Sequence, residues 1–197
     1  MLSLKEATSL KHKIAERMPF NARMFRGLLN KEQYLLYLRQ QLEIFRAIED
    51  RGLPHNSLKR VERVEADIAE LNAQGYSTDV VLGSTKKYTE YISSLSYEEV
   101  LPHVYLNYLA LVFGGQMMKK SVPSQGQMYE FDTIQDAVHS IRAVQKDSWA
   151  DEVNKGFDHC IAIFEELEVQ CAVENWIQSF YGIYKRNWNI RISILLC

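Results

Sequence analysis

The sequence predicts an all-α fold in a single domain. Only 4 Pro and 9 Gly occur among 197 residues, which favours long helices over many short strands. Apolar residues make up 47% of the chain, enough to build a buried core. They recur at steps of three or four, as one face of a helix requires. We expect a helical domain over residues 1–176 and a C-terminal tail, 177–197, whose structure the pattern leaves open.

The first helix is expected over residues 4–18. Its apolar face carries Leu4, Ala7, Leu10, Ile14 and Met18. Pro19 should end this helix, because the residue before a proline is pushed out of the helical region. The stretch after it, 20–29, is expected to be irregular.

Two further helices follow in the first half of the chain. Asn30 is expected to cap the first of them together with Gln33, and Gly52 should end it. The inward side chains of this helix are Tyr34, Tyr37, Leu38, Leu42, Phe45 and Ile48. Ser57 is expected to cap the next helix, which should end before Gly75.

The second half of the chain predicts four helices. One spans about 78–95, and a long apolar one spans 97–120 after a Ser96/Glu99 capping pattern. Pro102 should bend this long helix or delay its start. The last two helices are expected at about 133–149 and 151–176.

Charge, cysteine content and hydropathy exclude several classes of protein. Lys and Arg number 23 and Asp and Glu 25, so the formal charge of −2 argues against a nucleic-acid binder. Three cysteines without a CxxC pair suit a reducing compartment, and with no visible secretion signal we expect a cytoplasmic protein. The uncharged run 100–118 is long enough to span a bilayer, but its Pro, His, Asn, Gln and two Gly residues favour a buried functional helix.

His12 is the first candidate for chemistry. A neutral imidazole is a good axial ligand for heme iron, and Glu16, one turn later, could accept the second ring N–H and hold the tautomer. The alternative is an ordinary exposed contact between two surface side chains.

Two more patterns allow a functional and a structural interpretation. Gly114 and Gly115 interrupt an apolar helix, either for a flat macrocycle or for a neighbouring helix. Arg142 and Lys146 would place two cations one turn apart, either for a pair of carboxylates or as a solvated face. The apolar stripe that includes Phe157 and Phe164 is by itself typical of a core.

Three sequence blocks, taken together, resemble the heme oxygenase family. They lie in the family's order and cover about residues 4–170. The blocks read Leu4-Lys5-Glu6-Ala7-Thr8 with His12 and Ala15-Glu16; His103-Val104-Tyr105 and Asn107-Tyr108-Leu109 running into Gly114-Gly115-Gln116 and Lys119-Lys120; and Phe157 to Phe164-Glu165-Glu166-Leu167.

The resemblance implies a multi-helix bundle with heme between the first, proximal helix and a distal helix kinked at Gly114-Gly115. His12 would ligate the iron, with Glu16 as its hydrogen-bond partner, and the two glycines would let the distal backbone approach the ring. Lys5, Tyr105, Arg142 and Lys146 would face the heme propionates, and Leu111, Phe157 and Phe164 would contact the ring.

The activity implied is oxygen- and reductant-dependent opening of heme to biliverdin, with release of carbon monoxide and ferrous iron. Heme is then both cofactor and substrate. The resemblance also implies an external electron donor, such as ferredoxin or a flavoprotein reductase, that docks at Lys119 and Lys120. We expect a monomer or weak dimer.

The distal block departs from the family at two positions. The family usually reads Gly-Asp-Leu-Ser-Gly-Gly, and its Asp anchors distal waters. Here Leu111 stands in the place of that Asp, and Phe113 replaces the small hydroxyl residue. Asn107, one turn before Leu111, is our first candidate to replace the Asp as water anchor, ahead of His159.

Three other functions remain open on the sequence alone. The chain could bind heme or a related tetrapyrrole as a carrier, a sensor or a weakly active enzyme, as Leu111 suggests. It could be a di-iron oxidase that uses the pairs His12/Glu16, Glu99/His103 and Asp136/His139. A plain helical adaptor would bind no heme and would leave the Gly-Gly pair unexplained.

Overall fold

The computed structural model describes the backbone of residues 2–195 and the side chains of residues 2–173. Every regular element in this described part is helical, which confirms the predicted all-α class. The α-helices are α1 (Leu4–Arg17), α2 (Pro19–Phe25), α3 (Lys31–Arg51), α4 (Val61–Ala73), α5 (Gly83–Ser93), α6 (Tyr97–Phe113), α7 (Gly115–Met118), α8 (Ile134–Val144) and α9 (Ala150–Leu195). Three 3-10 turns lie at Asn56–Leu58, Gln127–Tyr129 and Asp147–Trp149.

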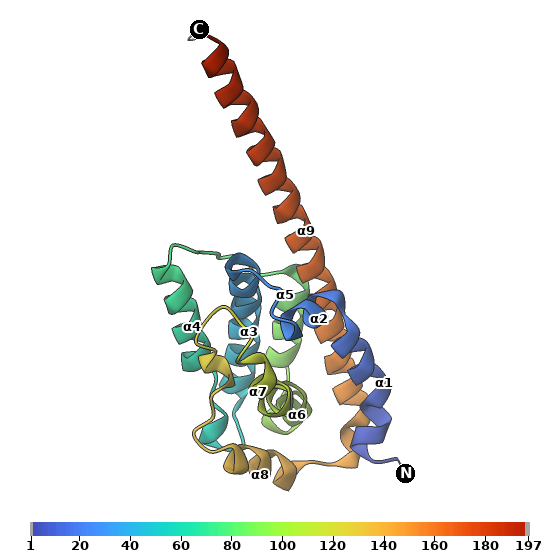
Figure 1. The fold of residues 1–197 in the computed structure, drawn as a ribbon. Helices are drawn as coiled ribbons and strands as arrows, with labels where there is room; N and C mark the ends of the chain where they lie inside the picture. Colours follow the sequence, from blue (N-terminus) through green and yellow to red (C-terminus); the bar gives the residue numbers. More distant parts are fainter. Residues whose placement is uncertain (1, 196–197) are drawn as a thin grey trace.

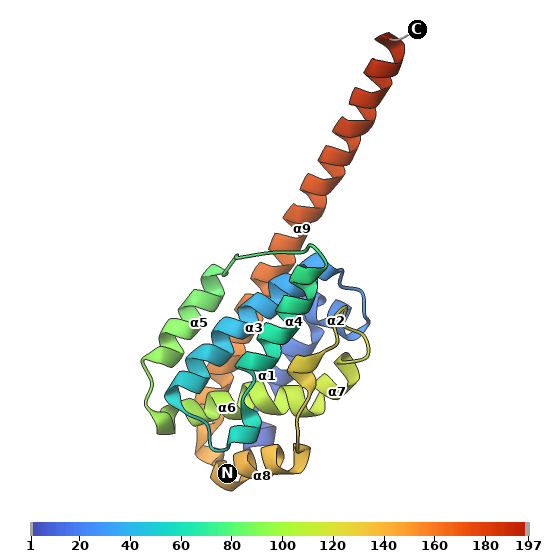
Figure 2. The ribbon, with the colours of Figure 1, turned by 90° about the vertical axis from the view of Figure 1, so that its left-hand side faces the viewer.

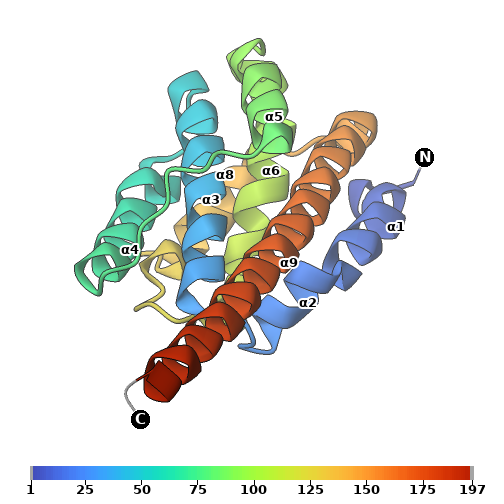
Figure 3. The ribbon, with the colours of Figure 1, turned by 90° about the horizontal axis from the view of Figure 1, so that it is seen from above.

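The helices form a bundle from which the second half of α9 projects (Figure 1). α3 packs between α4 and α5, and α6 runs across the lower part of the bundle (Figure 2). α1 and α2 lie along the first half of α9, as the view from above shows (Figure 3). α1 and α6 both pack against α9.

The core consists of two clusters of buried side chains. The larger one joins α2, α3, α4, α5, α6, α8 and α9 and includes Phe45, Tyr88 and Tyr108. The smaller one joins α1, α6 and α9 through residues such as Leu4 and Leu101. Burial of this apolar area is the main force that holds α1 against the bundle.

The predicted helix starts that depend on capping boxes are confirmed. The backbone N–H of Gln33 donates to Asn30 Oδ1 at 2.8 Å, and that of Ser96 donates to Glu99 Oε2 at 2.9 Å. Pro102 lies inside α6 without delaying its start at Tyr97.

Residues 19–25 are helical, so the predicted irregular stretch is wrong there. Pro19 occupies the first turn of α2, where the backbone N–H that proline lacks has no partner within the helix. Pro19 thus ends one helix and begins the next.

Two helix starts differ from the prediction because their caps come from distant residues. α4 begins at Val61 and not at Ser57, and the Glu49 carboxylate of α3 accepts the Val61 N–H at 3.1 Å. α5 begins at Gly83, where the carboxylate of Glu166 accepts the backbone N–H groups of Gly83 at 3.0 Å and Ser84 at 2.7 Å. These carboxylates fix the helix starts across the fold.

The later helices also end differently. α8 ends at Val144, so the predicted helix to 149 is too long. The predicted helix 97–120 is interrupted at Gly114 between α6 and α7. α9 continues to Leu195, past the predicted end at 176. Side chains of the proposed tail 177–197, including Cys197, lie outside the described residues, and the division at 176 stays a prediction.

Candidate functional site

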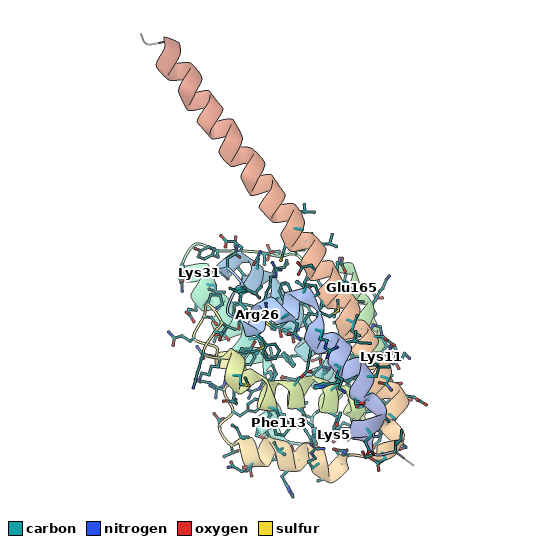
Figure 4. All side chains as sticks on the ribbon, turned by 45° about the vertical axis from the view of Figure 1, so that its right-hand side comes forward. Lys5, Lys11, Arg26, Lys31, Phe113 and Glu165 are labelled. Atoms are coloured by element: carbon teal, nitrogen blue, oxygen red, sulfur yellow. The ribbon has the colours of Figure 1, made fainter. Side chains whose placement is uncertain are left out.

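A cleft of about 660 Å³ lies between α1 and α6, with α2, α3, α8 and α9 completing its walls. Lys5 on α1 and Phe113 on α6 come from its two long walls (Figure 4). The cleft brings together most of the predicted site residues: Lys5, His12, Glu16, Tyr105, Asn107, Leu111, Gly114, Arg142, Phe157 and Phe164.

His12 presents its imidazole from the α1 wall. Its side chain is 56% exposed, and Nε2 lies 3.6 Å from Glu16 Oε1. That separation is too long for a hydrogen bond. The ring also meets the edge of the Phe157 ring, with centroids 5.8 Å apart. His12 is therefore accessible from the cleft and rests on an aromatic side chain of α9.

The two glycines of the distal segment have different surroundings. Gly114 lines the cleft, where a Cβ would meet the Phe25 ring at 3.6 Å and the Ala110 carbonyl oxygen at 3.1 Å. Gly115 does not line the cleft. A Cβ there would lie 2.4 Å from Cδ1 of the buried Tyr129. The structure thus accounts for Gly115 by packing and leaves only Gly114 at the cleft.

Gly115→Ala should lower the free energy of unfolding by about 1–3 kcal/mol, because its methyl group would overlap the Tyr129 ring. Chemical denaturation of the apo protein measures this change. Gly83→Ala is the matched control, since a Cβ there meets Glu166 Oε1 at an ordinary 3.5 Å. Equal stability of the two variants would contradict the packing role of Gly115.

Three cations and one carboxylate give the cleft its charge. Lys5, Lys13 and Arg142 line it together with Glu16. The Arg142 guanidinium carbon is 5.9 Å from the centroid of the Tyr105 ring. Lys13, which was not among the predicted site residues, adds a cation from the same helix as Lys5.

The structure does not bring Lys146 to the cleft. α8 ends before it, so it does not stand one turn from Arg142 on a helix. Its side chain is 60% exposed, Nζ lies 3.9 Å from Glu98 Oε2, and it does not line the cleft. The predicted pair of cations on α8 is therefore not formed.

Lys119 and Lys120 lie outside the cleft lining. The ammonium group of Lys119 pairs with the Glu130 carboxylate, and Lys120 is exposed. Of the two predicted docking residues, Lys120 is the one that faces solvent.

A chain of polar side chains leads away from the cleft at Asn107. The Asn107 amide contacts Tyr88 Oη at 3.1 Å, and Tyr88 Oη lies 2.9 Å from His103 Nδ1. His103 Nε2 lies 3.0 Å from Glu152 Oε1. His159 stacks on the Tyr88 ring and does not line the cleft, which leaves Asn107 as the candidate on this wall.

The pairs required for a di-iron site do not converge. The Glu99 carboxylate accepts a hydrogen bond from the Ser96 hydroxyl at the start of α6. His103 contacts Glu152 and not Glu99. Asp136 and His139 are exposed on α8. Among the described residues, no group of three His, Cys, Asp or Glu side chains could hold a metal ion.

Several residues that line the cleft belong to no sequence pattern that would have marked them as site residues. They come from α2, α3 and α9 and include Asn21, Phe25, Tyr37, Gln41 and Cys160. Burial raises the pKa of the Cys160 thiol to about 12, so it stays protonated at neutral pH. Lys13 could have been found from its spacing of eight residues to Lys5, two steps of i+4 along α1.

A family model matches most of this chain. The model described as heme oxygenase matches residues 1–166. The chain belongs to the heme oxygenase family. The heme oxygenase of Guillardia theta is 28% identical over 203 residues, covering 85% of this chain and 86% of that protein. Heme oxygenase 2 of Oryctolagus cuniculus is 26% identical, and this chain spans 65% of its length.

The fold agrees with that family. The crystal structure of heme oxygenase-1 from the cyanobacterium Synechocystis sp. PCC6803, solved in complex with heme, matches with a TM-score of 0.72. The match has 20% sequence identity and covers 91% of this chain and 97% of that one. The predicted family, fold and class of heme-degrading oxidoreductase are confirmed at the level of the heme oxygenase family.

The predicted absence of a membrane span can be checked over the described helices. None of them combines the length and apolar character that crossing a bilayer requires.

Proposed function

We propose that this chain opens heme to biliverdin in the cleft between α1 and α6, releasing carbon monoxide and ferrous iron. The observation that carries the proposal is the placement of His12. It is the only histidine among the described residues that lines the cleft, and it comes from the wall opposite α6 and Gly114. An imidazole in that position can ligate an iron held in the cleft.

The residues present fit heme in size, polarity and charge. A volume of about 660 Å³ lies within the range of ligand pockets in general. Phe157, Phe164 and Leu111 offer an apolar lining to a flat ring. Lys5, Lys13 and Arg142 offer cations to its two propionates.

Each wall then has a separate task. His12 would hold the iron through its imidazole, and Glu16 lies close enough to steady the ring. Gly114 would let the α6 backbone approach the opposite face of the heme. Tyr105 and Arg142 close the edge where the propionates would lie. Bound heme supplies the redox-active iron and the ring carbon that is oxidised.

The distal face needs a polar group, because Leu111 is apolar and only 3% exposed. We assign that role to Asn107, one turn before it and within the cleft lining. Its amide oxygen can accept a hydrogen bond from a water molecule and so hold the water over the ring.

The reaction needs electrons from outside the chain. We propose that a ferredoxin or a flavoprotein reductase docks beside the distal segment at the exposed Lys120. The neighbouring Lys119, paired with Glu130, would add to the positive charge there. We further propose that the chain works in the cytoplasm as a monomer or weak dimer.

One observation favours a second function. Buried Leu111 gives the distal wall no carboxylate, as expected of a heme carrier or sensor that does not oxidise its ligand. This alternative shares His12 as the ligand and differs only in the fate of the bound heme.

Titration of the purified chain with hemin, and then addition of a mild reductant in air, distinguishes these functions. We expect a Soret band that saturates at one heme per chain and then decays as a broad red biliverdin band grows. The titration is repeated with ferredoxin and with a flavoprotein reductase as electron donors. A Soret band that stays stable with each donor would identify a carrier or sensor. Absence of any Soret complex would reject both functions.

A further inference from the structure

A continuous series of hydrogen bonds runs from the cleft to the surface through α6, α5 and α9. It begins at Asn107, passes through Tyr88 and His103, and ends at Glu152. Tyr88 and His103 are both fully buried, whereas the Glu152 side chain is 32% exposed. A buried polar series of this kind is costly unless every member is satisfied.

The orientation of the Asn107 amide is fixed by its partners. One amide atom lies 2.8 Å from the backbone carbonyl oxygen of His103. A carbonyl oxygen can only accept, so that amide atom is Nδ2. Its second hydrogen is donated to Tyr88 Oη at 3.1 Å. Both hydrogens are then used, and Oδ1, which accepts no hydrogen bond from the described residues, is the amide atom left for the cleft.

The proton positions in the rest of the series can be derived in turn. Tyr88 Oη accepts from Asn107, so its own hydrogen is donated to His103 Nδ1 at 2.9 Å. His103 is then neutral and carries its proton on Nε2, which donates to Glu152 Oε1 at 3.0 Å. Every donor points from the cleft towards the Glu152 carboxylate.

The surroundings of His103 favour this state. Burial lowers the pKa of His103 and outweighs the hydrogen bond to Glu152, which raises it. Burial opposes the charge on Glu152, but hydrogen bonds from Tyr91 and His103 outweigh it and lower the pKa of that carboxyl. The α9 backbone also packs on the His103 ring, since a Cβ at Gly156 would lie 3.1 Å from Nδ1.

We propose that Glu152, His103 and Tyr88 are positioning residues that hold the Asn107 amide with its oxygen towards the cleft. The distal wall then offers water an acceptor and no donor at this point, as a carboxylate would. The inference rests on the proposed function, because it assigns Asn107 its orientation for the same reaction. It explains how an amide can occupy a role for which Leu111 is unsuited.

The arrangement depends on pH through His103. Protonation would turn Nδ1 into a donor, and Tyr88 Oη would then face donors from both Asn107 and His103. The other titratable or charged groups around His103 are Glu152, Lys155 and His159 from α9 and Tyr91 from α5. The neutral state is populated above the pKa of His103, so the Asn107 orientation is retained at neutral pH and lost as the pH falls through that pKa.

The first test uses NMR of the full apo chain labelled with ¹⁵N, without any heme. We expect His103 at pH 7 as the neutral tautomer with its proton on Nε2, and slow solvent exchange of both Asn107 side-chain amide hydrogens. A proton on Nδ1 at pH 7 would overturn the proposal. This measurement needs no folded variant and does not depend on catalysis.

The second test compares Tyr88→Phe with Tyr108→Phe. Both remove a fully buried hydroxyl, but that of Tyr108 donates to Glu49 at 3.4 Å and belongs to no part of the series. In Tyr88→Phe we expect Asn107 amide exchange to accelerate about tenfold, the factor that corresponds to the loss of one hydrogen bond of ordinary net strength. Biliverdin formation should fall by a similar factor and lose its acid-side pH dependence, with unchanged heme affinity.

Equal amide exchange in the two variants would overturn the positioning role. Failure of the wild-type chain to form biliverdin would instead reject the proposed function, and the NMR results on the apo chain would still decide the orientation of Asn107. The two proposals therefore fail through different measurements.

Discussion

His12→Ala is expected to leave the fold intact and to abolish most biliverdin formation. The His12 side chain is 56% exposed and lies on a helix, where alanine is the most favourable residue. Its loss removes the edge contact with Phe157 and little else from the apo protein. Heme in the cleft would lose its ligand from the protein. Biliverdin formation should then fall by at least ~10- to 100-fold, the loss that changes around a metal ligand cause.

Resonance Raman spectroscopy of the reduced heme complex measures this directly through the iron–histidine stretching band. We expect the band to disappear in His12→Ala and added imidazole to restore part of the turnover. His139→Ala, which removes an exposed histidine of α8 outside the cleft, is the control and should behave as wild type. An unchanged band and unchanged turnover in His12→Ala would reject His12 as the ligand.

Asn107→Leu should retain heme binding and reduce biliverdin formation about a hundredfold, the lower end of what positioned proton-transfer groups contribute. Leucine has the same branched shape and number of side-chain heavy atoms as asparagine but cannot accept a hydrogen bond from water. With Leu111 one turn away and 3% exposed, this stretch of the distal wall would then be apolar. Heme would stay in the cleft without an ordered water over it.

Stopped-flow spectroscopy at full heme occupancy separates binding from turnover in this variant. Asn154→Leu is the matched control, because that amide donates to the Ala7 carbonyl at 3.3 Å and does not line the cleft. Its Oδ1 is buried without a hydrogen-bond partner, so the substitution removes an unsatisfied group. Equal biliverdin rates in Asn107→Leu and wild type would rule out Asn107 as the water anchor.

These two predictions differ in how far the sequence alone could support them. The candidate ligand His12 and its neighbour Glu16 are four residues apart on one helix, so their contact can be derived from helical geometry. Asn107 is also visible in the sequence, but its orientation is not. That orientation depends on Tyr88, which is 19 residues away, and on Glu152, which is 49 residues from His103.

The same contrast explains the errors in the predicted helices. Capping boxes join residues three apart, and those at Asn30/Gln33 and Ser96/Glu99 were predicted correctly. The starts of α4 and α5 were not, because their caps are the distant carboxylates of Glu49 and Glu166. Lys146 lies outside α8 because this helix ends earlier than its periodicity predicts.

The sequence by itself determined the all-α class, the family and the two walls of the cleft, because these depend on periodicity and on blocks of residues within a few turns of one another. Only the tertiary structure decided that Gly114 and not Gly115 lines the cleft, that Lys13 and not Lys146 joins Arg142 there, and that the Asn107 amide nitrogen bonds to Tyr88. These outcomes depend on how helices pack, and packing brings together residues whose separation along the chain carries no signal.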